Sequence, residues 1–160
     1  MKILVLSDSH GNVDNMAQAV SRTAPDQIIH LGDVMRDGEK LHAMFPEIPF
    51  AQVPGNCDFG SFDQPEQVLC LEDKRILICH GHTRHVKESL LGIMYAAEEQ
   101  KADIVLFGHT HRIFSETRNG IAMLNPGSIG DPRYPTYGIV EIVQGEILLS
   151  TVPLNGYPHK

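Results

Sequence analysis

The sequence predicts an α/β protein, with a mixed sheet or two packed sheets and helices on the outside. In the first two thirds of the 160 residues, short apolar runs alternate with helical patterns, and the last third reads as hairpins. Strands that alternate with helices favour parallel pairing, and hairpins add antiparallel strands. We expect one domain over residues 1–160, long enough to bury a sizeable core.

The expected elements follow from apolar periodicity and turn residues. We expect buried strands at residues 2–7, 27–32, 49–55 and 103–109, and two more strands on either side of a tight turn at residues 72–74. A helix is expected from Asn12, whose side chain can cap the first turn, and others over residues 38–45 and 86–102. Two hairpins are expected to turn at Asn119-Gly120 and Gln144-Gly145.

Composition excludes several classes of function. The net charge of −7 argues against general nucleic-acid binding and against anionic membranes, because both require a basic face. Cys57, Cys70 and Cys79 are an odd number without framework spacing, which favours a reducing compartment. The first apolar run is too short for a signal peptide, and no run approaches membrane-spanning length. We therefore expect a cytoplasmic protein.

Polar clusters follow five of the apolar runs. In α/β sheets the carboxyl ends of strands form the crevice in which ligands bind, so these clusters are expected to meet at one rim. Glycine beside each cluster permits sharp turns and close backbone approach. The clusters are Asp8-x-His10, Gly32-Asp33, Gly55-Asn56, His80-Gly81-His82 and Gly108-His109-x-His111.

These residue types indicate metal binding. In extended backbone, residues i and i+2 point to the same side, so Asp8 and His10 are expected to bind one ion together, as are His109 and His111. Imidazole, carboxylate and amide ligands suit Mn²⁺, Fe²⁺, Zn²⁺ or Ni²⁺ rather than Ca²⁺. Any single cluster fits a capping aspartate or a hydrogen-bonded loop histidine equally well. Five clusters, each behind a strand, favour the metal site.

The other histidines have simpler interpretations. His30 lies inside an expected strand and is interpreted as a packed residue that supports the site. His42 and His159 are expected in solvent, and His85 is expected on the surface, with a place near the rim as the alternative.

In this order, "DSHGN", "GD", "GNCD", "HGH" and "GHTH" resemble the motifs of the calcineurin-like metallophosphoesterase superfamily. The chain length and the elements "GNCD" and "NPGS" resemble its small bacterial and archaeal branch, the YfcE-type phosphodiesterases. The resemblance covers nearly the whole chain. It implies a four-layer α/β/β/α sandwich, in which two mixed β-sheets are flanked by helices.

The resemblance also implies a centre of two divalent metal ions, with Mn²⁺ expected and Ni²⁺, Fe²⁺ or Zn²⁺ possible. The resemblance further implies that a hydroxide bridging the two ions attacks a phosphate ester. The first ion would be bound by Asp8, His10 and His111, the second by Asn56, His80 and His109, and Asp33 would bridge the two.

Further residues receive supporting roles. Asp33 and Asn56 are expected to act in catalysis as ligands, while His82 and Asp58 orient ligands or water. Two interpretations stay open for Arg84 and Arg133. Each side chain either contacts a phosphate or is exposed to solvent.

Cys57 occupies a position at which much of the superfamily has histidine, a plausible general acid. The metal site already supplies a nucleophile and the ligand set is complete without sulfur. We interpret Cys57 as a bystander or a minor supporting residue, and expect the enzyme to prefer leaving groups of low pKa.

The expected function is a metal-dependent phosphoesterase, and specifically a phosphodiesterase, that acts on small phosphate esters. One alternative is a phosphomonoesterase or nucleotide phosphatase that uses the same site. The other is a non-catalytic interaction scaffold, because the retromer subunit Vps29 resembles this branch. The hairpins of the last third are a possible route to a homo-oligomer.

Overall fold

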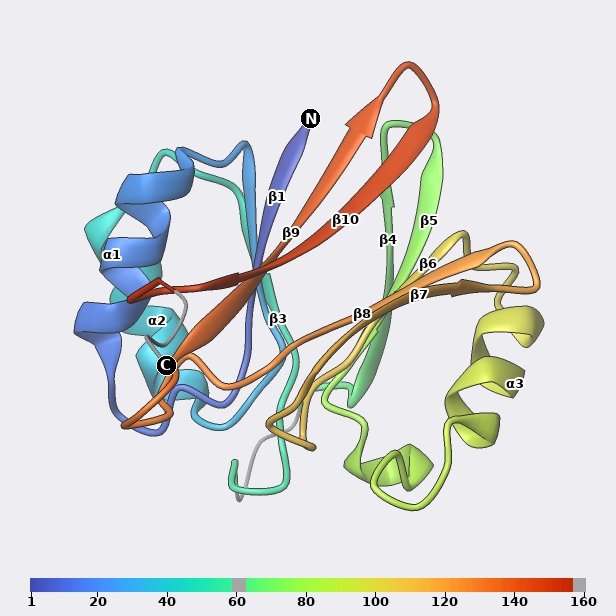
Figure 1. Cartoon of the computed structure of the whole chain (residues 1–160), viewed down its shortest axis with the longest axis horizontal. Coiled ribbons are helices and arrows are strands. Elements are labelled where there is room, and N and C mark those ends of the chain that lie inside the picture. The colour runs from blue at the N-terminus through green and yellow to red at the C-terminus, as the bar shows by residue number, and fades with distance from the viewer. Residues whose placement is uncertain (59–62, 157–160) are drawn as a thin grey trace.

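The computed structural model describes residues 1–58 and 63–156. Two five-stranded mixed sheets pack against each other, with α1 and α2 on one outer face and α3 on the other (Figure 1). The four-layer arrangement and the α/β fold class are therefore confirmed. The helices are α1 (Val13–Thr23), α2 (Met35–Met44), the short 3₁₀ helix η1 (His82–Arg84) and α3 (Leu91–Glu99).

The first sheet has the order β10-β9-β1-β2-β3 and the second the order β4-β5-β6-β8-β7. Strands β1, β2 and β3 are parallel, as are β5, β6 and β8, whereas the hairpins and the β1–β9 pair are antiparallel. The strands are β1 (Lys2–Leu6), β2 (Gln27–His30), β3 (Phe50–Gln52), β4 (Glu66–Leu71), β5 (Lys74–Cys79), β6 (Ile104–Leu106), β7 (Ile113–Arg118), β8 (Ile121–Pro126), β9 (Thr136–Val143) and β10 (Glu146–Pro153).

Strand β1 is apolar from Ile3 to Leu6 because both of its faces are covered there. Ile3 and Val5 join the core between the two sheets, while Leu4 and Leu6 join the core beneath α1 and α2. All four side chains are fully buried, and each contributes about 1.5–3 kcal/mol by leaving water. A third apolar cluster fills the space between the second sheet and α3. These cores hold the two sheets in fixed positions. The loops at the lower edge of the sheets in Figure 1 are therefore carried on a rigid framework.

Different interactions stabilise the N-termini of α1 and α2. The side chain of Asn12 accepts a hydrogen bond from the Asn15 amide at 3.0 Å, which confirms the predicted cap. Helix α2 starts at Met35, three residues before the expected range. Its N-cap residue offers no side-chain hydrogen bond, but the Asp58 carboxylate accepts from the Met35 amide at 2.8 Å. A residue distant in sequence therefore satisfies this helix end, which no local pattern shows.

Helix α3 is shorter than the expected range of residues 86–102, since it begins at Leu91. Val86 is buried, as its apolar character suggested, but it packs in a loop against Gly81. His85 has a left-handed backbone with φ of 54°, which interrupts a helix. The residues before α3 thus form a compact loop beside His80. No helix in the described part of the chain is long and apolar enough to cross a membrane.

Candidate metal centre

The loops that follow the parallel strands are tied to one another by backbone hydrogen bonds. At the edge of the first sheet, the Asp8 amide donates to the Gly32 carbonyl at 2.9 Å. At the edge of the second sheet, the Gly108 amide donates to the His80 carbonyl, also at 2.9 Å. Nδ1 of His80 lies 2.8 Å from the Leu31 carbonyl oxygen, which joins the two edges. The predicted meeting of these loops at one rim is confirmed.

Glycine permits the closest of these approaches. Gly32 has φ of 101°, and a Cβ atom there would lie 2.5 Å from the Gly55 amide nitrogen. A Cβ atom on Gly108 would overlap the hydroxyl of Ser7. A larger residue at either position would force the loops apart. These glycines therefore set the spacing of the side chains around the centre.

Asp8 lies at the centre of the cluster and is fully buried. Its Oδ1 atom is 3.1 Å from Nε2 of His111, 3.7 Å from Nε2 of His80 and 3.8 Å from Nε2 of His10. Its other oxygen, Oδ2, accepts a hydrogen bond from the Ser7 hydroxyl at 2.7 Å. Oδ1 thus faces three imidazoles while Oδ2 holds the carboxylate in place.

Asp33 faces His80 from the neighbouring loop. Its Oδ2 atom is 3.4 Å from Nε2 of His80, and its Oδ1 atom accepts from the Cys57 amide at 2.9 Å. Burial alone would raise the pKa of Asp33, but the Cys57 amide and His80 more than offset this, and the net pKa is lowered. Because the Leu31 carbonyl can only accept, Nδ1 of His80 carries the proton and Nε2 presents its lone pair to Asp33.

His109 completes the second side of the cluster. Its Nδ1 atom lies 3.2 Å from Nε2 of His80. Desolvation, followed by the neighbouring His80 and Lys87, lowers the pKa of His109 to about 4. The imidazole is therefore neutral at physiological pH, as a metal ligand must be.

The prediction that His109 and His111 bind one ion together, which assumed an extended backbone, is wrong. His111 turns to Asp8, whereas His109 turns to His80, so the two histidines face different partners. The backbone is left-handed at these positions, and the alternation of an extended strand does not apply. Positive φ angles occur at Asp8 (55°), His10 (43°), Asp33 (45°), His109 (71°) and His111 (60°).

The side chains fit a divalent cation. Ligand atoms lie within 4.8 Å of one another in two groups, one of Asp8, His10 and His111 and one of Asp8, Asp33 and His80. In the described part of the chain, no lysine or arginine forms an ion pair with Asp8 or Asp33. Buried carboxylates without a counter-charge are costly, so the cluster requires a cation for neutralisation. Carboxylate and imidazole donors suit a first-row transition metal.

Asn56 and Cys57 lie on the exposed rim beside Asp33. The Asn56 amide nitrogen is 3.8 Å from the Cys57 sulfur, and no hydrogen bond joins Asn56 to His80 or His109 among the described residues. Desolvation and the Asp33 carboxylate raise the pKa of the Cys57 thiol. The backbone amide of Cys57 donates to Asp33 and its thiol interacts with the same carboxylate, which agrees with its interpretation as a minor supporting residue.

The Asp58 carboxylate is directed at backbone amides. Oδ2 accepts from Asp33 at 3.0 Å and from Gly55 at 2.8 Å, and Oδ1 accepts from Met35. Both oxygens are thus used to fix the loop that carries Asp33. This geometry agrees with an orienting role and gives Asp58 no direct contact with the imidazoles.

His82 lies beside the second side of the cluster. Its ring centroid is 5.5 Å from that of His80 and 6.2 Å from that of His109. Within the described part of the chain its Nδ1 atom is buried without a hydrogen-bond partner. Desolvation, together with His80, lowers the pKa of His82. The ring therefore lies beside the imidazoles of two candidate ligands, which agrees with the predicted supporting role.

The two arginines differ. Nε and Nη2 of Arg84 lie 2.6 and 2.8 Å from the two carboxylate oxygens of Glu66, so this guanidinium is engaged away from the centre. That ion pair argues against a phosphate contact by Arg84. The Arg133 side chain is exposed, and its role stays open.

Asp37 is a site residue that the sequence interpretation missed. It is buried, and its Oδ2 atom accepts from the Gly11 amide at 2.7 Å and from the Ser9 hydroxyl at 2.8 Å, which holds the loop of Asp8 and His10. In the sequence it resembles any acidic residue in the first turn of a helix.

The remaining histidines agree with their expected places. His30 is fully buried, with Gln52 Oε1 at 3.2 Å and the Ser9 hydroxyl at 3.3 Å, which confirms a packed residue behind the site. His42 is exposed and stacks on Phe50, and His85 is exposed. His159 lies outside the described residues.

A family model of the calcineurin-like phosphoesterase superfamily domain matches residues 1–145. The chain belongs to this superfamily. It is 40% identical over 136 residues to the probable metallophosphoesterase YsnB of Bacillus subtilis, covering 83% of this chain and 78% of that protein. The carboxylate and imidazole cluster agrees with a metal-dependent phosphoesterase of this family.

Solved structures agree with the fold. A predicted phosphoesterase from Streptococcus pneumoniae superposes with a TM-score of 0.83 at 30% identity, covering 98% of this chain and 92% of that one. The phosphoesterase YfcE of Escherichia coli gives 0.72 at 25% identity, covering 97% and 94%. Vps29 of Entamoeba histolytica in complex with zinc gives 0.71 at 19% identity, covering 97% and 100%, a likeness of fold alone.

Proposed function

We propose that this phosphoesterase is a phosphodiesterase that hydrolyses small phosphate diesters at a centre of two divalent metal ions. The single observation that carries the proposal is the pair of buried carboxylates, Asp8 and Asp33, which are surrounded by imidazoles and, among the described residues, form no ion pair with a lysine or arginine. Such a cluster is suited to hold cations and, through them, an anionic ester. The likeness to YfcE, which is named a phosphodiesterase, supports the substrate class.

The two ions would be divided between the two sides of the cluster. Asp8, His10 and His111 hold one ion, and their mutual proximity supports this set. Asn56, His80 and His109 hold the other, with Asp33 between the two; this requires the exposed Asn56 amide to turn inward. Asp8 belongs to both groups of close ligand atoms, so it would lie near both ions.

When bound, such ions supply Lewis acidity toward the phosphate and lower the pKa of bound water toward about 7. The chain's own residues prepare the site for this chemistry. The Leu31 carbonyl fixes the tautomer of His80, and Asp58 and Asp37 fix the loops of Asp33 and Asp8. His82 presents an unpartnered nitrogen with which it can hydrogen-bond the bound ester, in the described part of the chain. Mn²⁺ is the proposed native ion.

A comparison of model substrates tests the proposal. The purified protein is assayed for metal content and for hydrolysis of bis(p-nitrophenyl) phosphate and p-nitrophenyl phosphate with added Mn²⁺. We expect diester hydrolysis that a chelator abolishes and Mn²⁺ restores. A faster monoester reaction would instead assign the chain to the phosphomonoesterases. Absence of hydrolysis in a metal-loaded protein would overturn the enzymatic function.

The scaffold alternative rests on the shared fold with Vps29. The carboxylate and imidazole positions of both ligand groups are occupied and brought together here, which favours catalysis over a purely structural role. Two further predictions belong to the proposal. The composition predicts a cytoplasmic location, and the terminal hairpins are predicted to mediate self-association.

A further inference from the structure

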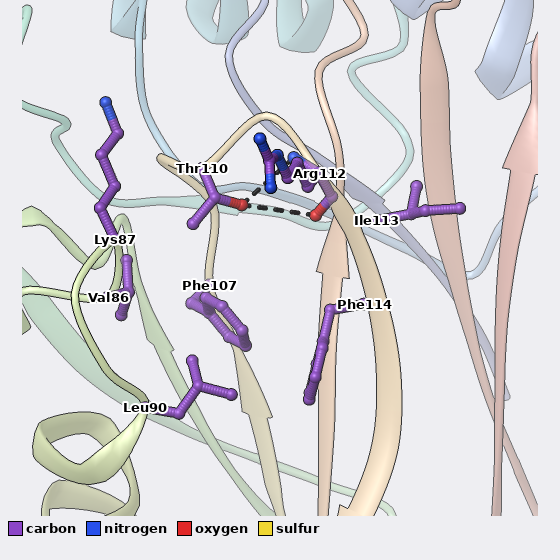
Figure 2. Close-up of a pocket in the computed structure, with 8 residues that line it drawn as sticks. All are labelled: Val86, Lys87, Leu90, Phe107, Thr110, Arg112, Ile113 and Phe114. Atoms are coloured by element: carbon purple, nitrogen blue, oxygen red, sulfur yellow. Dashed lines mark hydrogen bonds between the residues drawn. The ribbon is translucent and has the colours of Figure 1, made fainter.

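A cavity of about 560 Å³ lies between the loop that leads into α3 and the loop after β6 (Figure 2). Its volume lies within the range of small-molecule sites, which is about 300–1,000 Å³. None of the predicted metal ligands lines it. The lining residues are Val86, Lys87, Leu90, Phe107, Thr110, Arg112, Ile113 and Phe114.

The loop after β6 forms one wall of the cavity and also carries two of the candidate metal ligands. Thr110 lines the cavity and lies between His109 and His111 in the chain. The Thr110 hydroxyl also accepts from the Asn125 side chain at 3.0 Å and from the Arg112 amide at 3.2 Å, so this wall is fixed. Lys87, which also lines the cavity, lies close enough to His109 to lower the pKa of that imidazole, so the cavity lies beside the centre.

The chemistry of the lining is divided between an apolar base and a cationic mouth. Phe107 is 1% exposed, and its ring lies 6.0 Å from that of Phe114, centroid to centroid. Figure 2 shows the ammonium of Lys87 and the guanidinium of Arg112 at the same end as Thr110, with Leu90 and the two rings at the other. Apolar side chains at the base favour a ring, since aromatic faces and edges contact one another well.

Charge complementarity favours an anionic ligand at the mouth. No acidic residue lines the cavity, and within the described residues neither Lys87 nor Arg112 forms an ion pair. Lys87 and Arg112 therefore place two positive charges at the mouth of the cavity. They would attract the negative charge of a phosphate ester bound next to them.

We propose that this cavity is the subsite for the organic group of the substrate, and that the enzyme selects phosphate esters bearing a planar apolar ring, such as an aryl group. The ring lies between Leu90, Phe107 and Phe114 while the phosphate is held at the metal centre. This inference rests on the proposed function, because it places the phosphate at that centre. It adds to that function the part of the substrate that the enzyme recognises, an aromatic ring, and the residues that bind this ring.

Binding of non-hydrolysable phosphonates tests the subsite without turnover. The Zn²⁺-loaded protein is titrated with phenylphosphonate and methylphosphonate by calorimetry. We expect phenylphosphonate to bind about tenfold or more tightly, because its ring leaves water. Leu90→Trp, which fills the cavity, should reduce this preference to within about twofold. The matched control Leu91→Trp alters an exposed neighbour that does not line the cavity, and should keep the preference.

Equal affinity of the two phosphonates for the wild-type protein would overturn the subsite, as would a preference that survives in Leu90→Trp. Should that variant fail to fold, nuclear Overhauser contacts from the phenyl protons to the methyl groups of Val86, Leu90 and Ile113 in the wild-type complex decide the question. Contacts to these groups support the proposal, and contacts only to other residues contradict it.

A kinetic comparison separates this inference from the proposed function. Methyl p-nitrophenyl phosphate and phenyl p-nitrophenyl phosphate share a leaving group and differ in the retained group. We expect a higher kcat/KM for the phenyl ester, lost in Leu90→Trp. Hydrolysis of both esters at equal kcat/KM would refute the subsite and leave the phosphodiesterase standing. Hydrolysis of neither, with the phenyl preference in binding intact, would refute the phosphodiesterase and leave the subsite.

Discussion

Nδ1 of His80 donates a hydrogen bond to the carbonyl oxygen of Leu31 at 2.8 Å, and this contact joins the loops of the two sheets at the candidate metal centre. It fixes both the orientation of the imidazole and the nitrogen that carries the proton. Nε2, which bears the lone pair, then faces Asp8 and Asp33 at 3.7 and 3.4 Å. A single backbone carbonyl thereby prepares a metal ligand.

Replacing His80 with alanine should therefore affect both metal binding and stability. We expect the variant to lose at least one ion per chain, measured by elemental analysis. The Leu31 carbonyl loses its donor, which costs about 1–3 kcal/mol in the free energy of unfolding. His42→Ala, at an exposed position, is the control and should change neither quantity. Full metal content in His80→Ala would contradict the assignment.

Asp58 should act as a positioning residue. Removing its carboxylate in Asp58→Ala leaves the amides of Asp33, Gly55 and Met35 without their acceptor. We expect metal affinity to fall by about 10–100-fold, with a lower thermal midpoint. Asp58→Asn, which retains one oxygen, should recover part of the affinity. Unchanged affinity in Asp58→Ala would show that the Asp33 loop does not depend on it, and Glu47→Ala, at an exposed residue, is the control.

Cys57 should contribute little to the chemical step. Its backbone amide donates to Asp33, and Cys57→Ala retains that amide. We expect diester turnover to fall by far less than the ~100-fold at the low end of a general acid's contribution. Cys57→His should raise monoester turnover, because imidazole can protonate a leaving group of higher pKa. A loss beyond about 100-fold in Cys57→Ala would refute this interpretation.

The metal-free protein should lose stability as the pH falls from 6.5 toward 4. Burial lowers the pKa of His30, and desolvation, with His80 and Lys87, lowers that of His109 to about 4 from 6.5. In this window the unfolded chain binds protons that the folded chain does not, so acidification favours unfolding. The lowered pKa of Asp33 acts only below its ordinary 3.8, outside the window.

Thermal midpoints of the metal-free protein across this pH range provide the measurement. His109→Gln should flatten the dependence, whereas His42→Gln should follow the wild-type curve, since His42 is exposed. A midpoint that does not change over the window would contradict the lowered histidine pKa values.

The strands and the rim of the centre could be predicted because their causes are local. Apolar runs such as residues 2–6 and 104–106 form buried strands, and polar residues that follow them necessarily meet at one edge of the fold. The direction of each ligand could not be predicted in this way. Left-handed backbone at His109 and His111 depends on how the loops pack, and the sequence offers no glycine at either position to indicate it.

The supporting contacts were also beyond a local pattern. Asp37 holds the Asp8 loop from an adjacent helix, and Asp58 satisfies the start of α2 from another loop. The role of Leu31 belongs to its carbonyl, which every residue carries. Such contacts are set by tertiary structure, and only the structure reveals them.

The most direct test of the two-ion centre is to measure metal content and diester turnover together in the wild-type protein and in Asp33→Asn. Asp33 stands between the two proposed ions, and asparagine keeps its shape while removing its charge. We predict two ions per chain and chelator-sensitive hydrolysis in the wild type, with loss of both in the variant. Wild-type turnover in Asp33→Asn with its metals still bound would contradict the account.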